Sequence, residues 1–352
     1  MTTSSEHRPR PAIAVIVATH RRPDAIASLV RALDRQTLPR DAWEAAVVVD
    51  GRDETEAEYR RVLEDARGRL GIPLAYAFQE NAGPAPARDR AIAATRAPWL
   101  CITDDDMDPV PGYLAAHLAA LEEGGEHAVV IGNVVPEEGW HAQPLYEAMR
   151  THSMLALHRG LQDGTRRAQG AVLVTQNVSL SRAAYERVGG FDLALRLGED
   201  TELGWRLERE GARFVFAKEA SAVHRSRVGS YETWLARQFQ YGRNAVYIHR
   251  KLGCDPRSHP LRNLLNGNAV KRAAVLAVCW SDRLGQTTIS ALRSGGKLLH
   301  RFHFTGMAVA SHKGIMALAY HLGVKEALGS WAAVRAEGRA FKASPGRPLD
   351  PT

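Results

Sequence analysis

Short apolar runs alternate with helical segments through the first hundred residues of this chain. The runs lie at residues 12–19, 45–51, 72–79 and 98–103. Runs of this length that are apolar on both faces are typical of buried parallel strands. Between the first two runs, Ile26, Leu29, Val30 and Leu33 recur at helical spacing. The alternation predicts βαβ units, and hence an α/β fold with a Rossmann-like, mostly parallel sheet flanked by helices.

The pattern becomes less regular after residue 112. We expect helices at 112–125 and 198–211, and strands at 127–135, 171–182 and 213–217. Residues 140–168 follow no pattern that assigns a structure, and are either a functional loop or an ordinary helix with a flexible join. From Ser230, which suits a helix N-cap, the chain is expected to be helical.

These patterns divide the chain into four parts. We expect a disordered N-terminus at 1–11, a catalytic α/β domain at 12–225, a basic helical extension at 226–343 and a loose tail at 344–352. The three cysteines are far apart, the first ten residues do not resemble a signal peptide, and the longest strongly apolar run near the C-terminus, residues 273–280, is much shorter than the roughly 20 residues that span a bilayer. We therefore expect a cytoplasmic protein, peripheral at most on the inner face of the membrane.

Charge is unevenly spread along the chain. Residues 1–225 carry a net charge of −6, whereas residues 226–352 carry +13. A basic region of this kind predicts either a polyanionic partner or a solvated helical face. Residues 268–285 and 289–304 combine apolar and basic side chains, which favours an anionic membrane surface, although an oligomer interface or an acceptor-binding subdomain explains the same pattern. No nucleic-acid partner is expected, because aromatic residues are not concentrated among the basic ones.

Three consecutive aspartates follow the predicted strand at 98–103, within "CITDDDMDPVPG". Oxygen ligands clustered at a strand end are typical of a site for Mg²⁺ or Mn²⁺. An EF-hand is excluded, because its sixth and twelfth positions would be Pro109 and Ala115. The remaining alternative is an acidic turn before Gly112. In open α/β sheets ligands bind beyond the carboxyl ends of the strands, so we expect Thr19 and Asp50 to border the same site.

Taken in order, these motifs resemble those of family 2 glycosyltransferases, which have the GT-A fold. The resemblance spans about residues 12–225 and rests on five segments: "AIAVIVATHRRPDAIASLVRAL", "VVVDG", "ENAGPAPARDRAI", "TDDD" and the stretch from "VGGFD" through "GEDTELGW" to "EASAVH". It implies a hexosyltransferase that moves a sugar from a nucleotide diphosphate sugar to an acceptor hydroxyl with inversion.

The resemblance implies a role for each carboxylate of the "TDDD" motif. Asp104 and Asp106 would hold Mn²⁺ or Mg²⁺, with His224 as a third ligand, and Asp105 would face the ribose or sugar of the donor. The ion would stabilise the charge that develops on the leaving diphosphate. A histidine at the end of a strand is also common without any ligand role.

On the nucleotide side, the resemblance implies that Asp50 accepts the imide N–H of uracil or thymine, so the donor would be a UDP- or dTDP-sugar. Thr19 and His20 lie on the first strand-to-helix loop, Gly83 gives the next loop freedom to approach the ligand, and Arg88 would contact the nucleotide or its phosphates. Each has a plainer alternative: Asp50 as the start of a turn, His20 as a surface residue, and Arg88 as an exposed residue in a first helical turn.

On the acceptor side, Asp200 would be the general base and Glu199 would support it or position the acceptor. Both also suit the first turn of a helix, where acidic residues interact well with the helix dipole. The acceptor would be a glycan, a lipid-linked sugar or a small natural product. The alternatives are a sugar nucleotidyltransferase, which the absence of glycine in "ATHRRPDA" disfavours, and a non-catalytic protein that binds a polyanion or a membrane.

Overall fold

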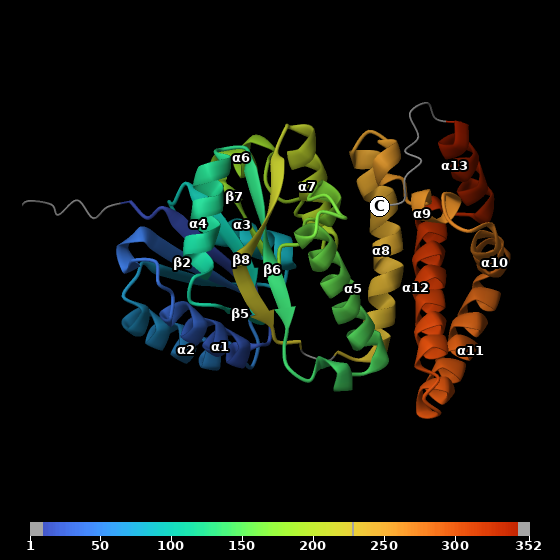
Figure 1. Ribbon diagram of the computed structural model, residues 1–352, viewed down its shortest axis with the longest axis horizontal. Helices are drawn as coiled ribbons and strands as arrows, with labels where there is room; N and C mark the ends of the chain where they lie inside the picture. Colours follow the sequence, from blue (N-terminus) through green and yellow to red (C-terminus); the bar gives the residue numbers. More distant parts are fainter. Residues whose placement is uncertain (1–9, 227–228, 344–352) are drawn as a thin grey trace, which may run out of the picture. The chain divides into compact units, whose positions relative to one another are not determined.

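The computed structural model describes residues 10–226 and 229–343, so most of the predicted disordered N-terminus and the predicted tail at 344–352 lie outside the described residues. The chain divides into two compact units (Figure 1). The first contains residues 1–140 and 151–227, and the second contains residues 141–150 and 228–352.

The first unit is built on one sheet. Within the described residues, its order is β3-β2-β1-β4-β7-β6-β8-β5. The strands are β1 (Ile13–Thr19), β2 (Trp43–Asp50), β3 (Leu74–Gln79), β4 (Trp99–Asp104), β5 (Met107–Pro109), β6 (Ala128–Pro136), β7 (Asn177–Ser181) and β8 (Arg213–His224). Strands β1 to β4 pair in parallel, as does β6 with β8, whereas β7 runs antiparallel to both of its neighbours. The predicted mostly parallel α/β sheet is confirmed.

Helices cover both faces of this sheet (Figure 1). They are α1 (Pro23–Asp34), α2 (Glu56–Leu70), α3 (Pro84–Ala93), α4 (Tyr113–Gly124), α6 (Arg182–Arg187) and α7 (Glu199–Arg209). Ile13, Val15 and Val17 of β1 pack in one core with α1, α2 and α4, whereas Ala14 and Ile16 pack in another with α3, α6 and α7. Because both faces of β1 are buried, its sequence is apolar throughout rather than alternating.

The strand order brings the predicted site residues to one edge of the sheet. β1 lies between β2 and β4 and runs parallel to both, so Thr19, Asp50 and Asp104 all lie at carboxyl ends of neighbouring strands. β5 pairs antiparallel with β8, with Met107 opposite His224. This pairing returns His224 to the turn that follows β4.

The structure contains two elements that were not expected, β5 and α6, and it differs from the expectations at residues 171–176 and 140–168. Only residues 177–181 of the predicted strand at 171–182 form β7, because Asn177 pairs with Thr103 and β4 turns away immediately afterwards, leaving residues 171–176 without a strand to pair with. The unassigned segment at 140–168 contains a helix, α5 (Leu145–Gln162), which the boundary between the two units crosses.

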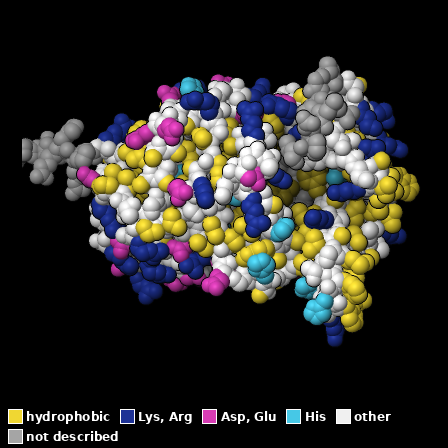
Figure 2. Space-filling view, viewed as in Figure 1, with side chains coloured by type: hydrophobic (Ala, Val, Ile, Leu, Met, Phe, Trp, Pro, Cys, Tyr) yellow, Lys and Arg dark blue, Asp and Glu magenta, His cyan; other side chains and the backbone are white. Residues whose placement is uncertain are grey.

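The second unit contains helices and no strand among its described residues, and it includes the start of α5. Its helices are α8 (Tyr231–Lys251), α9 (Arg262–Leu265), α10 (Ala269–Cys279), α11 (Asp282–Arg301), α12 (Thr305–Leu328) and α13 (Trp331–Ala343). All six contribute to one apolar core. Hydrophobic side chains also gather on the outside of this unit, along the edge formed by α10 and α11 (Figure 2). No helix in the described part of the chain is both long enough and apolar enough to cross a membrane.

Helices α8 and α12 cross so closely that only glycine fits. A Cβ atom on Gly242 would lie 1.9 Å from the Tyr320 carbonyl oxygen, and one on Gly323 would lie 2.1 Å from the Phe239 carbonyl oxygen. Backbone on both sides leaves no flexible side chain to move aside, so a larger residue must push the two helices apart.

We therefore expect Gly242→Ala to lower the free energy of unfolding of the second unit by about 2 kcal/mol or more, through overpacking. The matched control is Gly295→Ala in α11, where nothing lies within 4 Å of the added methyl group. There the better helix propensity of alanine should raise stability by about 0.5–1 kcal/mol. Urea unfolding followed by circular dichroism measures both, and equal effects would contradict the close crossing.

Candidate active site

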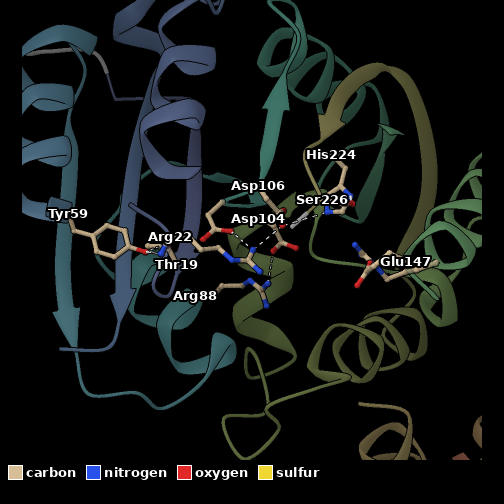
Figure 3. Close-up of polar contacts among 11 residues, drawn as sticks. Thr19, Arg22, Tyr59, Arg88, Asp104, Asp106, Glu147, His224 and Ser226 are labelled. Atoms are coloured by element: carbon tan, nitrogen blue, oxygen red, sulfur yellow. Dashed lines mark hydrogen bonds and ion pairs between the residues drawn. The ribbon is translucent and has the colours of Figure 1, made fainter. Parts of the chain in front are cut away.

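The aspartate turn after β4 is held by cations of the chain itself (Figure 3). Arg22 Nη1 donates to Asp105 Oδ1 at 3.2 Å and to Asp106 Oδ2 at 2.9 Å. Arg88 Nη2 donates to Asp104 Oδ1 at 2.8 Å. Every aspartate of the turn therefore has a guanidinium partner, which offsets the repulsion between three adjacent charges.

Asp105 is the buried member of the three. Its Oδ2 accepts the Thr19 hydroxyl at 2.6 Å, and Thr19 Oγ1 lies 2.7 Å from the Tyr59 hydroxyl. Because the single Thr19 hydroxyl proton serves Asp105, Tyr59 donates to Thr19, and it accepts the backbone N–H of Arg22 at 2.6 Å. Burial raises the pKa of Asp105 to about 6. Its carboxylate thus anchors the turn from within the protein, and its contact with a donor stays a prediction.

Arg88 joins the aspartate turn to the second acidic motif. Its side chain is buried, and Nη1 donates to Glu199 Oε1 at 2.7 Å while Nη2 holds Asp104. A guanidinium that bridges two carboxylates in this way fixes their separation. The sequence alone also allowed an exposed position for Arg88, but the structure buries its side chain.

Glu199 and Asp200 begin helix α7, directly after Gly198 in left-handed conformation. Asp200 Oδ1 accepts the backbone N–H of Thr201 at 2.7 Å. Burial, together with the neighbouring charge of Glu199, raises the pKa of Asp200 to about 7. A carboxylate with this pKa can accept a proton and release it again near neutral pH. The role of Asp200 as general base remains a prediction that this electrostatic environment suits.

Asp50 organises the loop that leads into α3. Its Oδ1 accepts from Gln79 Nε2 and from Ala82 N, each at 2.9 Å, and its Oδ2 accepts from Gly83 N at 2.8 Å. A carboxylate has about four acceptor positions, so one remains for a ligand. Gly83 has φ = +105°, which explains the need for glycine at the start of α3.

His20 packs beside the same strand end. Its Nδ1 lies 2.7 Å from the Asp50 carbonyl oxygen and so donates to it, and the ring itself is exposed. The side chains predicted to meet the nucleotide, Thr19, His20, Asp50 and Gly83, therefore border the carboxyl ends of β1 and β2, and their contact with a nucleotide stays a prediction.

His224 approaches the aspartate turn from β8. Its Nε2 lies 3.6 Å from Asp106 Oδ2, and its Nδ1 lies 2.9 Å from Ser226 Oγ. The backbone N–H of Arg225 donates to the Asp106 carbonyl at 2.8 Å and ties the two segments together. One carboxylate and one imidazole nitrogen at this separation form a donor set that suits Mn²⁺ better than Mg²⁺.

Asp104 does not complete this set as it stands. Among the residues that the structure describes, the ligand atoms of Asp104, Asp106 and His224 are not all within 4.8 Å of one another. Asp104 is directed to Arg88 instead. Asp106 and His224 therefore suit a divalent cation once Arg22 leaves Asp106, and Asp104 would need to rotate away from Arg88 to join them.

Arg22 and Tyr59 are the polar residues of this site that the sequence did not reveal. Arg22 stands three residues after the end of β1, and it meets the aspartates because β1 and β4 are neighbours with Ala18 opposite Asp104. The order of the strands is needed to see this contact. The basic pair "RR" after the first strand was the only signal, and it indicated no partner.

A second group of metal-binding residue types occurs in the helical unit. The ligand atoms of His249, His259 and Glu337 lie within 4.8 Å of one another. However, Nδ1 of His259 accepts the backbone N–H of Leu261 at 3.1 Å, so the neutral ring carries its proton on Nε2, the nitrogen that faces Glu337. Burial lowers the pKa of His259 to about 4 and keeps that ring neutral. This tautomer cannot offer a lone pair to an ion from Nε2, so we do not assign a metal site there.

Comparison with known families identifies the first unit. The profile described as "Glycosyl transferase family 2" matches residues 14–189, which is half of the chain. The chain therefore belongs to glycosyl transferase family 2, as the sequence motifs predicted.

Individual relatives differ in the length that they share with this chain. The pre-mycofactocin glycosyltransferase of Mycobacterium tuberculosis is 30% identical over 47% of this chain and 34% of its own length. The validoxylamine A glucosyltransferase of Streptomyces hygroscopicus subsp. jinggangensis is 29% identical over 60% of this chain and 55% of its own. The succinoglycan biosynthesis protein ExoU of Rhizobium meliloti is 26% identical over 69% of this chain and 71% of its own. The chain thus spans between a third and about half of the first two relatives.

The fold has a counterpart among solved structures. The mannosyltransferase PcManGT from Pyrobaculum calidifontis, in complex with GDP-Man and Mn²⁺, superposes with a TM-score of 0.60 at 18% identity, over 90% of this chain and 87% of that protein. The likeness supports the predicted GT-A fold with a helical C-terminal extension.

The bridge made by Arg88 predicts a large cost for its removal. Arg88→Ala would leave the buried carboxylate of Glu199 without its guanidinium partner. We therefore expect the free energy of unfolding to fall by about 3–5 kcal/mol. Arg31→Ala, at an exposed position of α1, is the control and should change it by less than about 0.5 kcal/mol. Urea denaturation measures both, and similar values would show that Arg88 does not hold the two motifs.

Proposed function

We propose that this protein is a metal-dependent, inverting hexosyltransferase that moves a sugar from a nucleoside diphosphate to an acceptor hydroxyl. The observation that carries the proposal is the Arg88 bridge, which joins the aspartate turn to the acidic start of α7 through two short charged hydrogen bonds. The aspartate turn suits the phosphates of a donor, and the acidic start of α7 suits an acceptor. The bridge therefore sets the distance between the two halves of a transfer reaction.

The donor side needs positive charge, because a diphosphate approaching three aspartates would otherwise be repelled. Asp106 and His224 would hold Mn²⁺ or Mg²⁺, joined by Asp104 after it turns from Arg88. When bound, the ion supplies charge to stabilise the leaving diphosphate. Arg22 is 36% exposed and contacts Asp106 through one nitrogen, so it can move from the carboxylate to a phosphate oxygen. We assign Arg22 the role of a built-in counterion that exchanges partners when donor and metal arrive.

The acceptor side depends on the unusual proton affinity of Asp200. With its pKa near 7, its carboxylate would accept the hydroxyl proton as the acceptor oxygen attacks the anomeric carbon. Glu199, held by Arg88, lies next to Asp200, and this neighbouring carboxylate helps to keep the proton affinity of Asp200 high. Attack from the face opposite the leaving diphosphate inverts that carbon.

The base of the donor is recognised at the end of β2 in this proposal. The remaining acceptor position of Asp50 suits the imide N–H of uracil or thymine, which favours a UDP- or dTDP-sugar. Guanine also presents a ring N–H, and the mannosyltransferase of similar fold was solved with GDP-Man. A donor panel should therefore contain UDP-, dTDP- and GDP-sugars.

The acceptor class is broader. Relatives are named for pre-mycofactocin, for validoxylamine A and for succinoglycan biosynthesis. We accordingly propose a hydroxyl-bearing acceptor that is a glycan, a lipid-linked sugar or a small natural product. Slow hydrolysis of the donor, with water as acceptor, provides an assay that does not depend on knowing it.

The division of roles predicts different defects for two carboxamide variants. Asp106→Asn should weaken Mn²⁺-dependent donor binding about 10–100-fold, because it replaces a charged oxygen ligand with a neutral amide oxygen. Asp200→Asn should bind donor normally but lose about 10²–10⁴-fold in kcat, because the general base is gone. Calorimetry with Mn²⁺ and the donor panel measures binding, and release of nucleoside diphosphate measures turnover.

Asp41→Asn, at an exposed position before β2, serves as the control and should match the wild type in both assays. If Asp106→Asn and Asp200→Asn behaved alike, the assigned roles would be wrong. Formation of pyrophosphate from a nucleoside triphosphate and a sugar phosphate would instead identify a sugar nucleotidyltransferase. Binding of neither metal nor any nucleotide sugar would leave a non-catalytic protein.

The pKa of Asp200 predicts how activity depends on pH. Since its pKa is raised to about 7, the proton-accepting form is lost as pH falls, and kcat/KM should drop about tenfold for each unit below that value. A plot of kcat/KM between about pH 5 and pH 9 tests this. The residual activity of Asp200→Asn should lack the step near neutral pH, and a wild-type profile flat through pH 7 would exclude Asp200 as the titrating base.

A further inference from the structure

The helical unit exposes an unusual number of large apolar side chains at α10, α11 and the turn into α12. We call them the exposed apolar edge: Val270, Trp280, Leu284, Leu298, Phe302, Phe304 and Met307. Each exposes between 45% (Leu284) and 78% (Val270) of its surface. Figure 2 shows the hydrophobic side chains gathered along this part of the unit. Exposed apolar patches on this scale mark a surface that contacts something other than water.

Helix α11 gives the edge its geometry. Leu284, Ala291 and Leu298 are all exposed and are spaced by seven residues, and Phe302 follows four residues later. At 3.6 residues per turn these positions fall on one side of the helix, opposite the buried Ile289 and Gly296 that face the core. Phe304 and Met307 extend the stripe around the turn into α12. The result is a continuous ridge rather than scattered residues.

The surroundings of the ridge are basic. Residues 283–325 contain six Lys and Arg and no Asp or Glu, and Asp282, which directly precedes them, pairs with Lys325. Lys271, Arg283 and Arg301 are exposed, and within the described residues none of them pairs with a carboxylate. Their charge is therefore available to a partner, which must be anionic where it meets them and apolar where it meets the ridge.

We propose that the exposed apolar edge docks on an anionic lipid bilayer, with the ridge inserted at headgroup depth and the cations on the phosphates. Aromatic residues beside Lys and Arg are favoured at that depth. A second copy of the chain is disfavoured, because the same acid-free segment would face itself. Nucleic acid is disfavoured, because four of the seven side chains of the edge, Val270, Leu284, Leu298 and Met307, are aliphatic and cannot stack on bases as aromatic side chains do.

Vesicle flotation with the full chain tests this proposal. The wild type should float with mixed phosphatidylcholine–phosphatidylglycerol vesicles, not with phosphatidylcholine alone, and should detach at high salt. One double variant, Phe302→Ser with Phe304→Ser, removes apolar side chains from the ridge. The other, Lys297→Glu with Arg301→Glu, reverses the charge of two cations beside it. Each should weaken binding about tenfold or more. Because all four side chains are exposed, the variants should keep the fold, which circular dichroism checks.

Matched controls lie on the first unit. Val215→Ser and Arg61→Glu change an exposed apolar and an exposed basic residue there, and both should bind vesicles as the wild type does. The proposal fails if the wild type does not float with anionic vesicles, if it floats equally with neutral ones, or if the controls weaken binding as much as the edge variants. It also fails if the edge variants abolish a dimer without affecting flotation. None of these outcomes depends on sugar transfer, so the proposed function stands or falls separately.

Discussion

The ion pairs of Arg22 and Arg88 are the interactions on which the first unit depends. Four carboxylates, Asp104 to Asp106 and Glu199, approach the carboxyl end of one sheet, and without compensation they would repel one another strongly. Arg88 is buried and keeps its charge, so it holds Glu199 firmly and releases Asp104 only at the cost of a buried hydrogen bond. Arg22 is partly exposed and can exchange its partners. The same type of residue thus has a structural role in one place and an adjustable one in the other.

This difference bears on how a cation enters an acidic site. A divalent ion must displace a guanidinium from the carboxylates that it binds, and the cost depends on where that guanidinium can go. Arg22 can move to water or to a donor phosphate, whereas Arg88 leaves Asp104 only by giving up a buried hydrogen bond. Metal binding at Asp106 and His224 should therefore be the easier step, and recruitment of Asp104 should be coupled to the donor.

The sequence predicted the elements whose neighbours are close along the chain. Periodicity located β1 to β4 and their helices, and the rule that ligands bind beyond parallel strands brought Thr19, Asp50 and Asp104 to one edge. Prediction from the sequence failed where contacts depend on the order of the strands in the sheet. The start of β7 at Asn177 is set by where β4 stops, and the meeting of Arg22 with Asp105 requires β1 and β4 to be adjacent. Arg88 shows the same limit, since its partner Glu199 lies 111 residues away.

The uneven charge of the chain is consistent with two separate tasks. The first 225 residues are net acidic, so on their own they would be repelled from an anionic bilayer, and an anionic donor at the proposed site would need the help of cations. The remaining 127 residues carry +13 together with the exposed apolar edge. If the protein docks on anionic lipid as proposed, the attraction must therefore come from the helical unit. A basic surface placed next to the aspartates would compete with the metal for them, so assigning lipid contact to a separate unit keeps the aspartate turn available for its own cation.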